Sequence, residues 1–146
     1  MYRQRNGEVE IFLCHPGGPF YKNKDLGVWT MPKGEFNTDE DPLNAAKREF
    51  EEETGMEITG HFVPLTPVRY KGGAKIVYAW AVKGDIDEAA IHSNSFSLEW
   101  PPKSGKFIQV PEVDRGEWFS IHKAREKILP SLSPFIDDFV SNVIGN

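Results

Sequence analysis

The chain is short of features that would assign it to several classes of protein. Cys14 is its single cysteine, so no internal disulfide can form, and we expect a reducing compartment, the cytoplasm. No apolar run approaches membrane-spanning length, and no basic segment precedes an apolar stretch at Met1. The sequence therefore predicts neither a transmembrane helix nor a signal peptide, and we expect no membrane partner.

Basic residues are also outnumbered, with 17 lysines and arginines against 22 aspartates and glutamates, for a formal net charge of −5. A sequence-independent grip on nucleic acid needs a basic surface that displaces counterions, so nucleic acid is not an expected partner. A phosphorylated small molecule stays open as a ligand. Clustered carboxylates can hold divalent cations, and the cations then hold the phosphates.

The 146 residues fit one domain, and the sequence has no internal repeat, low-complexity tract or linker that would divide it. We expect a single domain over residues 1–146; the sequence predicts no oligomeric state. Turn signals and periodicity predict strands at Tyr2–Arg5, Val9–Cys14, Val28–Met31, Phe62–Tyr70, Ala74–Val82, Phe107–Val110 and Glu117–Phe119. Helices are expected after Asp41, Ser120 and Ser133, with Asp85–Lys106 as a long irregular connection. Strands interleaved with few helices indicate an α/β or α+β sandwich.

The helix expected after Asp41 carries the main candidate site. Asp41 is suited to cap its start, Pro42 to occupy its first position, and Gly55 to adopt the left-handed conformation after its end. At 100° per residue, three glutamates fall within roughly one third of the helix circumference. They are Glu49, Glu52 and Glu53. A neighbouring apolar stripe, which would pack on a sheet, comprises Leu43, Ala46, Phe50 and Thr54.

Three carboxylates this close repel one another and weaken an isolated helix, which favours a bound cation. Arg48 lies one turn before Glu52 and neutralises only one of them. Hard oxygen ligands suit Mg²⁺ or Mn²⁺. Glutamate runs are more often solvated helix faces, and Glu51 is expected to be such a residue.

Residues 34–56 follow the pattern G-x5-E-x7-R-E-U-x-E-E-x-G-U, in which U is a bulky apolar residue, here Phe50 and Met56. This stretch resembles the box of the Nudix hydrolases at every fixed position, and the strand order around it is similar too. The resemblance implies an α+β fold, a Nudix-type α/β/α sandwich with a mixed central sheet. It also implies hydrolysis of a nucleoside diphosphate linked to another group. The chain begins almost at its first hairpin, so we expect a first strand shorter than in similar proteins.

The same resemblance implies roles for the residues of the box. Glu49, Glu52 and Glu53 would ligate Mg²⁺, and the Gly34 carbonyl would add a ligand. Glu40 and Arg48 would brace the loop against the helix.

Glu49 is the first candidate for the general base, with Glu52 beside it in the catalytic group. In some relatives a carboxylate outside the box serves as the base, and Glu112 and Glu117 are the candidates here. Glu112 is also a candidate extra metal ligand. A solvated turn before a strand is an equally good reading of both.

The substrate is less closely defined. The box is entered by Trp29-Thr30-Met31-Pro32-Lys33, which resembles enzymes that cleave diadenosine polyphosphates. Lys33 is a candidate phosphate contact, and Trp100 or Phe96 a candidate base-stacking residue. An exposed lysine and a hydrophobic plug under the long loop are the alternative readings.

A dinucleoside polyphosphate or a nucleoside triphosphate is therefore the expected small-molecule substrate. A nucleotide sugar, ADP-ribose and the 5′ end of a messenger RNA are alternatives. A nucleotide-sensing module without catalysis is less favoured, because such modules usually lose box glutamates and this chain keeps them all.

Overall fold

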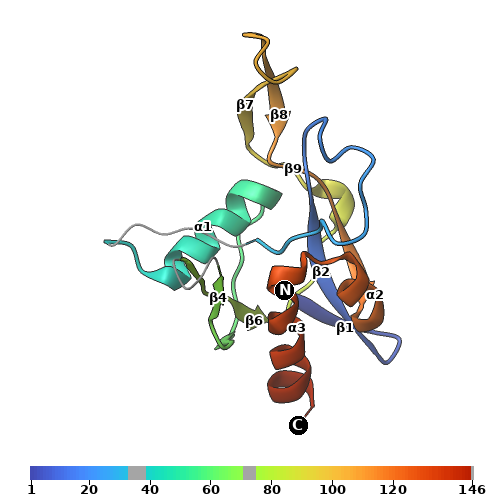
Figure 1. Ribbon diagram of the computed structural model, residues 1–146. Coiled ribbons are helices and arrows are strands. Elements are labelled where there is room, and N and C mark those ends of the chain that lie inside the picture. Colours follow the sequence, from blue (N-terminus) through green and yellow to red (C-terminus); the bar gives the residue numbers. More distant parts are fainter. Residues whose placement is uncertain (33–38, 71–74, 146) are drawn as a thin grey trace.

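The computed structural model describes residues 1–32, 39–70 and 75–145 (Figure 1). Its strands are β1 Tyr2–Arg5, β2 Glu8–Pro16, β3 Phe62–Pro64, β4 Val68–Tyr70, β5 Lys75–Val77, β6 Trp80–Val82, β7 Ser95–Glu99, β8 Phe107–Pro111 and β9 Val113–Ser120. Its helices are α1 Pro42–Thr54, α2 Ile121–Lys127 and α3 Ser133–Phe139, with 3-10 turns η1 Glu88–Ala90 and η2 Pro130–Leu132 and a π-helical turn η3 Val140–Ile144. Strands and helices are interspersed along the chain, which confirms the α+β prediction.

The first sheet contains β1, β2 and β9 in that order, with antiparallel pairing throughout. Asn6 and Gly7 connect β1 to β2, both with positive φ (53° and 81°), as the two-residue turn of a hairpin requires. The predicted strand at 28–31 is reduced to isolated bridges, in which Thr30 pairs with Cys14 and Trp29 pairs with Ile128.

The described residues of the two strands predicted at 62–70 and 74–82 form one long antiparallel ribbon that is interrupted in its middle; Ala74 lies outside the described residues. β3 pairs with β6 and β4 pairs with β5, while Leu65 N donates to Ala79 O (3.0 Å) between the two pairs. The ribbon joins the first sheet through a parallel bridge between Tyr2 and Lys83. This parallel contact among antiparallel pairs makes the sheet mixed, as expected.

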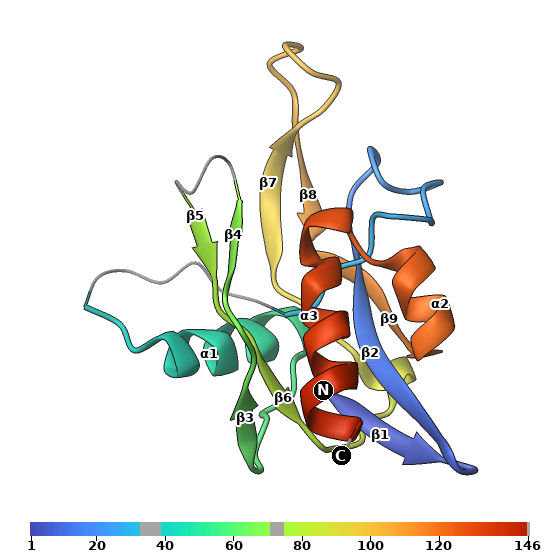
Figure 2. The ribbon, with the colours of Figure 1, turned by 60° about the horizontal axis from the view of Figure 1, so that its bottom comes forward.

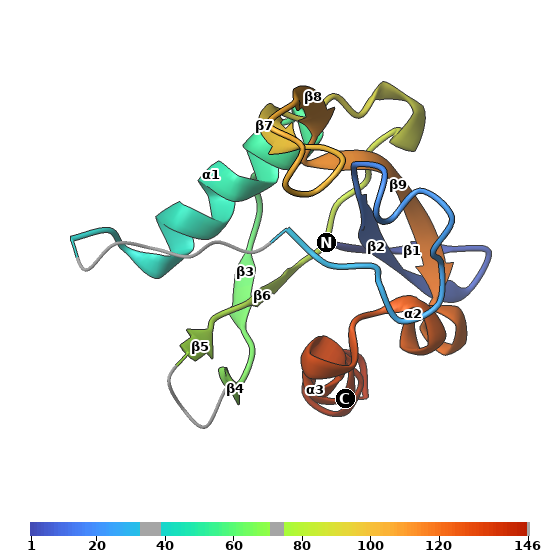
Figure 3. The same cartoon turned by 45° about the horizontal axis from the view of Figure 1, so that its top comes forward.

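Alternate residues of β2 contribute to two different cores. Ile11 and Leu13 are in a cluster with buried residues of α2 and α3, whereas Phe12 and Cys14 pack with Phe50 of α1. Successive side chains of a strand point to opposite faces, so the sheet has α1 on one side and α2 with α3 on the other. Figure 3 shows these helices on opposite sides of the strands, which is the α/β/α arrangement.

The expectation of an irregular connection over 85–106 was wrong in part. β7 and β8 pair from Ser95 opposite Pro111 to Glu99 opposite Phe107, forming a hairpin that projects from the body of the molecule (Figure 2). We call residues 95–111 the arm. The alternation Ser95-Phe96-Ser97-Leu98-Glu99 is a strand pattern, and its partner strand was already predicted. The arm begins and ends beside the C-terminal end of α1 and is therefore relevant to the site.

Within the described part of the chain, none of the helices has both the length and the apolar character needed to cross a membrane.

Candidate metal and catalytic site

Helix α1 begins and ends where its sequence signals place it. The Asp41 side chain accepts a hydrogen bond from Asn44 N (3.1 Å), and Pro42 is the first helical residue. Gly55 has φ 75°, and its N–H donates to the Glu51 carbonyl (2.7 Å). A Cβ on Gly55 would lie 2.6 Å from the His92 carbonyl oxygen, so a side chain is excluded by both conformation and space.

The packing of α1 fixes the direction in which its glutamates point. Ala45, Phe50 and Thr54 are buried against the sheet, and Glu51 is exposed on the opposite side. Glu49, Glu52 and Glu53 are half-buried, between these two faces. The predicted solvated position of Glu51 is confirmed.

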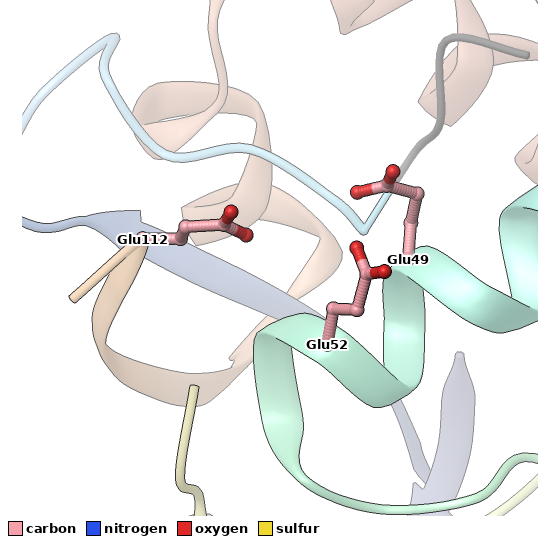
Figure 4. A group of neighbouring side chains, drawn as sticks. All are labelled: Glu49, Glu52 and Glu112. Carbon is pink, nitrogen blue, oxygen red and sulfur yellow. The ribbon is translucent and has the colours of Figure 1, made fainter. Parts of the chain in front are cut away.

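Glu49 and Glu52 meet a third carboxylate from outside the helix. Oxygen atoms of Glu49, Glu52 and Glu112 all lie within 4.8 Å of one another. Figure 4 shows Glu49 and Glu52 extending from α1 towards Glu112, which lies in the bend between β8 and β9. We call these three residues the carboxylate cluster. Their hard oxygen donors at this spacing fit a divalent cation such as Mg²⁺ or Mn²⁺.

Arg48 is a cation at the edge of the carboxylate cluster. Its Nη1 donates to Glu49 Oε1 (3.0 Å) and Glu52 Oε1 (3.1 Å), while Nε and Nη2 donate to the two oxygens of Glu40 (3.0 and 3.2 Å). One guanidinium therefore binds Glu40, in the turn that leads into the helix, and two carboxylates of the cluster. Among the described residues, Arg48 faces four acidic side chains when Glu112 is included, so their negative charge exceeds its positive charge.

The protonation of Glu49 reflects that surplus. Burial, and next the negative charge of Glu52, raise the pKa of the Glu49 carboxyl above its ordinary value, with a smaller contribution from Glu112. Arg48 acts in the opposite direction. The ionised form is thus disfavoured where the three carboxylates converge, as expected for a site that a cation completes.

Glu53, the third predicted ligand on the helix, is not among the three carboxylates that meet. The Glu53 carboxylate lies close enough to Cys14 to affect the ionisation of the Cys14 thiol. Cys14 belongs to the same core cluster as Phe50. Burial, and secondarily the negative charge of Glu53, raise the pKa of the Cys14 thiol well above its ordinary value. One carboxylate oxygen of Glu53 is buried, and its side chain leaves the helix about 100° around from Glu52.

The structure distinguishes the two candidates outside the box. Glu112 joins the carboxylate cluster, whereas Glu117 is exposed on β9, opposite Leu13 of β2. Lys33 and Gly34 lie outside the described residues.

Trp100 lies far along the arm from the cluster. The backbone N–H of Trp100 donates to the Lys106 carbonyl (2.8 Å) at the outer end of β8. At about 3.4 Å per residue, that end is about 20 Å along the strand from Glu112.

Sequence reasoning missed the segment that fixes Glu112 in place. Asn94 O accepts a hydrogen bond from Glu112 N (2.8 Å), and Asn94 N donates to Glu52 O (2.7 Å). Both bonds use backbone atoms, so these two contacts leave no signal in the sequence.

Comparisons with known proteins agree with this geometry. A family model of the NUDIX domain matches residues 2–139. An RNA pyrophosphohydrolase of Rhizobium meliloti (strain 1021) is 31% identical over 119 residues, covering 70% of this chain and 65% of that protein. An RNA pyrophosphohydrolase of Brucella anthropi is 32% identical over 119 residues, covering 70% and 62%. The chain thus spans slightly less than two thirds of the length of these relatives.

Solved structures support the fold. The crystal structure of a C. elegans Ap4A hydrolase binary complex superposes with a TM-score of 0.61 at 21% sequence identity, covering 99% of this chain and 95% of that chain. Identity this low shows a common fold alone. The mixed sheet between α1 and the α2–α3 pair is therefore an arrangement that solved proteins also adopt.

Proposed function

Because the chain belongs to the Nudix hydrolase family, we propose that it hydrolyses a pyrophosphate bond in a nucleoside diphosphate linked to another group. The observation that carries this proposal is the carboxylate cluster, in which two turns of α1 and the β8–β9 bend bring three carboxylates within 4.8 Å. Mutual repulsion makes such a cluster unfavourable by itself, and a cation with bound phosphates offsets that cost.

Glu49, Glu52 and Glu112 would hold the cation, which we propose to be Mg²⁺, with Mn²⁺ as a substitute. The bound ion would polarise the phosphates and stabilise the charge that develops on their oxygens. Glu53 and the Gly34 carbonyl remain proposed ligands, Glu53 from its place beside the cluster on α1 and Gly34 from its position in the box.

The remaining chemistry belongs to side chains. Glu49 is the proposed general base, which takes the proton from the attacking water. Glu52, its neighbour in the cluster, would orient Glu49. The alternative base is Glu112, the member of the cluster that comes from outside the helix. Arg48 and Glu40 brace the start of α1, and the guanidinium holds Glu49 and Glu52 in place through its two further hydrogen bonds.

For the substrate, we propose a dinucleoside polyphosphate or a nucleoside triphosphate. The entry Trp29-Thr30-Met31-Pro32-Lys33 supports this class, with Lys33 as a proposed phosphate contact. A role for Trp100 requires a long substrate, because the outer end of β8 is about 20 Å along the strand from Glu112. A dinucleoside polyphosphate carries a second nucleoside beyond its phosphate chain. Stacking of that base on Trp100 would therefore favour a dinucleoside polyphosphate over a nucleoside triphosphate.

A second candidate is the 5′ end of an RNA, favoured by the names of the similar bacterial proteins. The net charge of −5 favours a short nucleotide instead, because binding of a polynucleotide requires a basic surface. ADP-ribose and nucleotide sugars remain alternatives in the same family, and a non-catalytic sensing module is disfavoured by the intact cluster. The buried Cys14 fits a reducing, cytoplasmic setting.

A substrate panel tests these assignments. The protein is incubated with diadenosine tetraphosphate, ATP, ADP-ribose and a triphosphate-ended oligonucleotide in Mg²⁺ and isotopically labelled water, with a Glu52→Gln preparation as the control for contaminating hydrolases. We expect turnover of the first two compounds and label in one phosphorylated product, which identifies the phosphorus attacked. If nucleotides bind but no compound is hydrolysed beyond the control, the proposal is wrong. Preferred turnover of the oligonucleotide selects the second candidate.

A further inference from the structure

The segment His92–Asn94, which we call the strap, connects η1 to β7 and lies between α1 and the β8–β9 bend. On the α1 side, His92 N donates to the Thr54 carbonyl (2.9 Å) and Asn94 N donates to the Glu52 carbonyl (2.7 Å). On the other side, the Asn94 carbonyl accepts from Glu112 N (2.8 Å). The backbones of two members of the carboxylate cluster are thus joined through one residue.

Ser93, in the middle of the strap, adds a side-chain connection. Its Oγ lies 2.9 Å from the Val113 carbonyl oxygen and accepts a hydrogen bond from Val113 N (3.2 Å). The same hydroxyl lies 3.0 Å from the Asn94 carbonyl oxygen, which is its alternative acceptor. Val113 is only 4% exposed and directly follows Glu112. The hydroxyl therefore hydrogen-bonds to the backbone of a buried residue next to the cluster.

The position of Glu112 needs such support. Glu112 lies in a bend where β8 ends and β9 begins, close to an irregularity in the β2–β9 register between His15 and Pro16. Its carboxylate is held close to those of Glu49 and Glu52, against their mutual repulsion. Hydrogen bonds on both sides of the Glu112–Val113 peptide restrict the main-chain rotation that would relieve this repulsion.

We propose that Ser93 is a positioning residue for the divalent-metal site, holding Val113 and thereby the Glu112 carboxylate within reach of Glu49 and Glu52. This inference rests on the proposed function, because it takes Glu112 as a metal ligand. Ser93 itself does not touch the ion. Groups that orient metal ligands in this way typically change metal affinity by about 10- to 100-fold when they are removed.

The test measures Mn²⁺ affinity by electron paramagnetic resonance on the full chain, without substrate. Ser93→Ala is expected to weaken Mn²⁺ binding about 10-fold. Ser95→Ala, which changes an exposed serine on the neighbouring strand, is the matched control and should leave the affinity unchanged. Ser93→Cys, nearly the same size but a poorer hydrogen-bonding group, should also weaken binding, and it replaces Ser93→Ala if that variant does not fold.

A double-mutant cycle with Glu112→Gln separates positioning from general destabilisation. If Ser93 acts through Glu112, Ser93→Ala should cause no further loss of affinity once Glu112 is Gln. Equal losses from Ser93→Ala in both backgrounds would overturn the inference, as would unchanged affinity in folded Ser93→Ala and Ser93→Cys. If Glu112→Gln binds Mn²⁺ like the wild type, this inference fails alone, because the proposed hydrolysis is tested separately with Glu52→Gln and the substrate panel.

Discussion

Arg48 and Glu40 are joined by two hydrogen bonds, from Nε to Oε1 (3.0 Å) and from Nη2 to Oε2 (3.2 Å). The planar guanidinium presents both donors to one carboxylate, an arrangement that the single ammonium of lysine cannot reproduce. The remaining Nη1 contacts Glu49 and Glu52, so this pair links the start of α1 to the carboxylate cluster.

Replacement of Arg48 by lysine should therefore affect activity more than stability. Both side chains are partly exposed, and exposed ion pairs contribute about 0.2–1 kcal/mol, so the free energy of unfolding should fall by no more than about 1 kcal/mol. We expect kcat/KM to fall about 10-fold or more, because a shift of about 1 Å in a catalytic group is costly. Urea unfolding and steady-state kinetics test this prediction. A stability loss that accounts for the whole activity loss would contradict it.

Glu52→Gln should lower activity far more than Glu51→Gln, although the two positions are adjacent. Glu52 is in the carboxylate cluster and Glu51 is exposed, so only the first change removes a charged group from the site. Loss of such a contact typically costs about 10²-fold or more in rate. The Mg²⁺-induced increase in Tm should also shrink in Glu52→Gln alone. Equal, mild effects at both positions would contradict the observed facing of the helix.

Gly17→Ala should displace Glu112 through direct backbone contact. A Cβ on Gly17 would lie 1.9 Å from the Pro111 carbonyl oxygen, and Gly17 N donates to the Glu112 carbonyl (3.0 Å). Because backbone atoms must move to admit the methyl group, we expect a destabilisation of about 1–3 kcal/mol together with weaker metal binding.

Gly84→Ala is the control for this change. A Cβ on Gly84 would meet the flexible end of Met1 at 3.2 Å, which can move aside. Thermal unfolding and Mn²⁺ titration of both variants test the prediction, and wild-type metal affinity in Gly17→Ala would refute it.

The attachment of α3 to the β3–β4 connection should weaken in acid. Asp138 Oδ2 accepts a hydrogen bond from Thr66 N (2.6 Å), and its other oxygen accepts from Asn142. These bonds lower the pKa of the Asp138 carboxyl below its ordinary value of 3.8. A lowered pKa in the folded state stabilises the fold fully above the unfolded pKa, and this contribution is lost as pH falls through the folded pKa.

Asp138→Asn should therefore be less stable than the wild type near pH 6, and the two should converge as the pH approaches 3. Chemical unfolding at a series of pH values measures the difference, with Glu57→Gln, at an exposed position, as the control. A difference that stays constant down to pH 3 would show that the carboxylate charge is not responsible.

The elements predicted correctly are those with local causes. Asp41, Pro42 and Gly55 bound α1 because capping and the left-handed conformation depend on a few consecutive residues. The Asn6-Gly7 hairpin follows in the same way from two residues that tolerate positive φ. The spacing of Glu49 and Glu52 places both on one side of the helix, since the helical repeat is fixed.

The features that only the tertiary structure decides depend on contacts between distant residues. Glu112 and Glu117 are equivalent as sequence signals, and Glu112 joins the cluster because the strap ties the β8–β9 bend to α1 through residues far apart in the chain. The arm was missed although Ser95–Glu99 alternates like a strand, because five alternating residues form a stable strand only when they pair with a partner, here Phe107–Pro111. The sequence by itself determined the helix and the common facing of Glu49 and Glu52, and long-range backbone hydrogen bonds determined which carboxylate from outside the helix joins them.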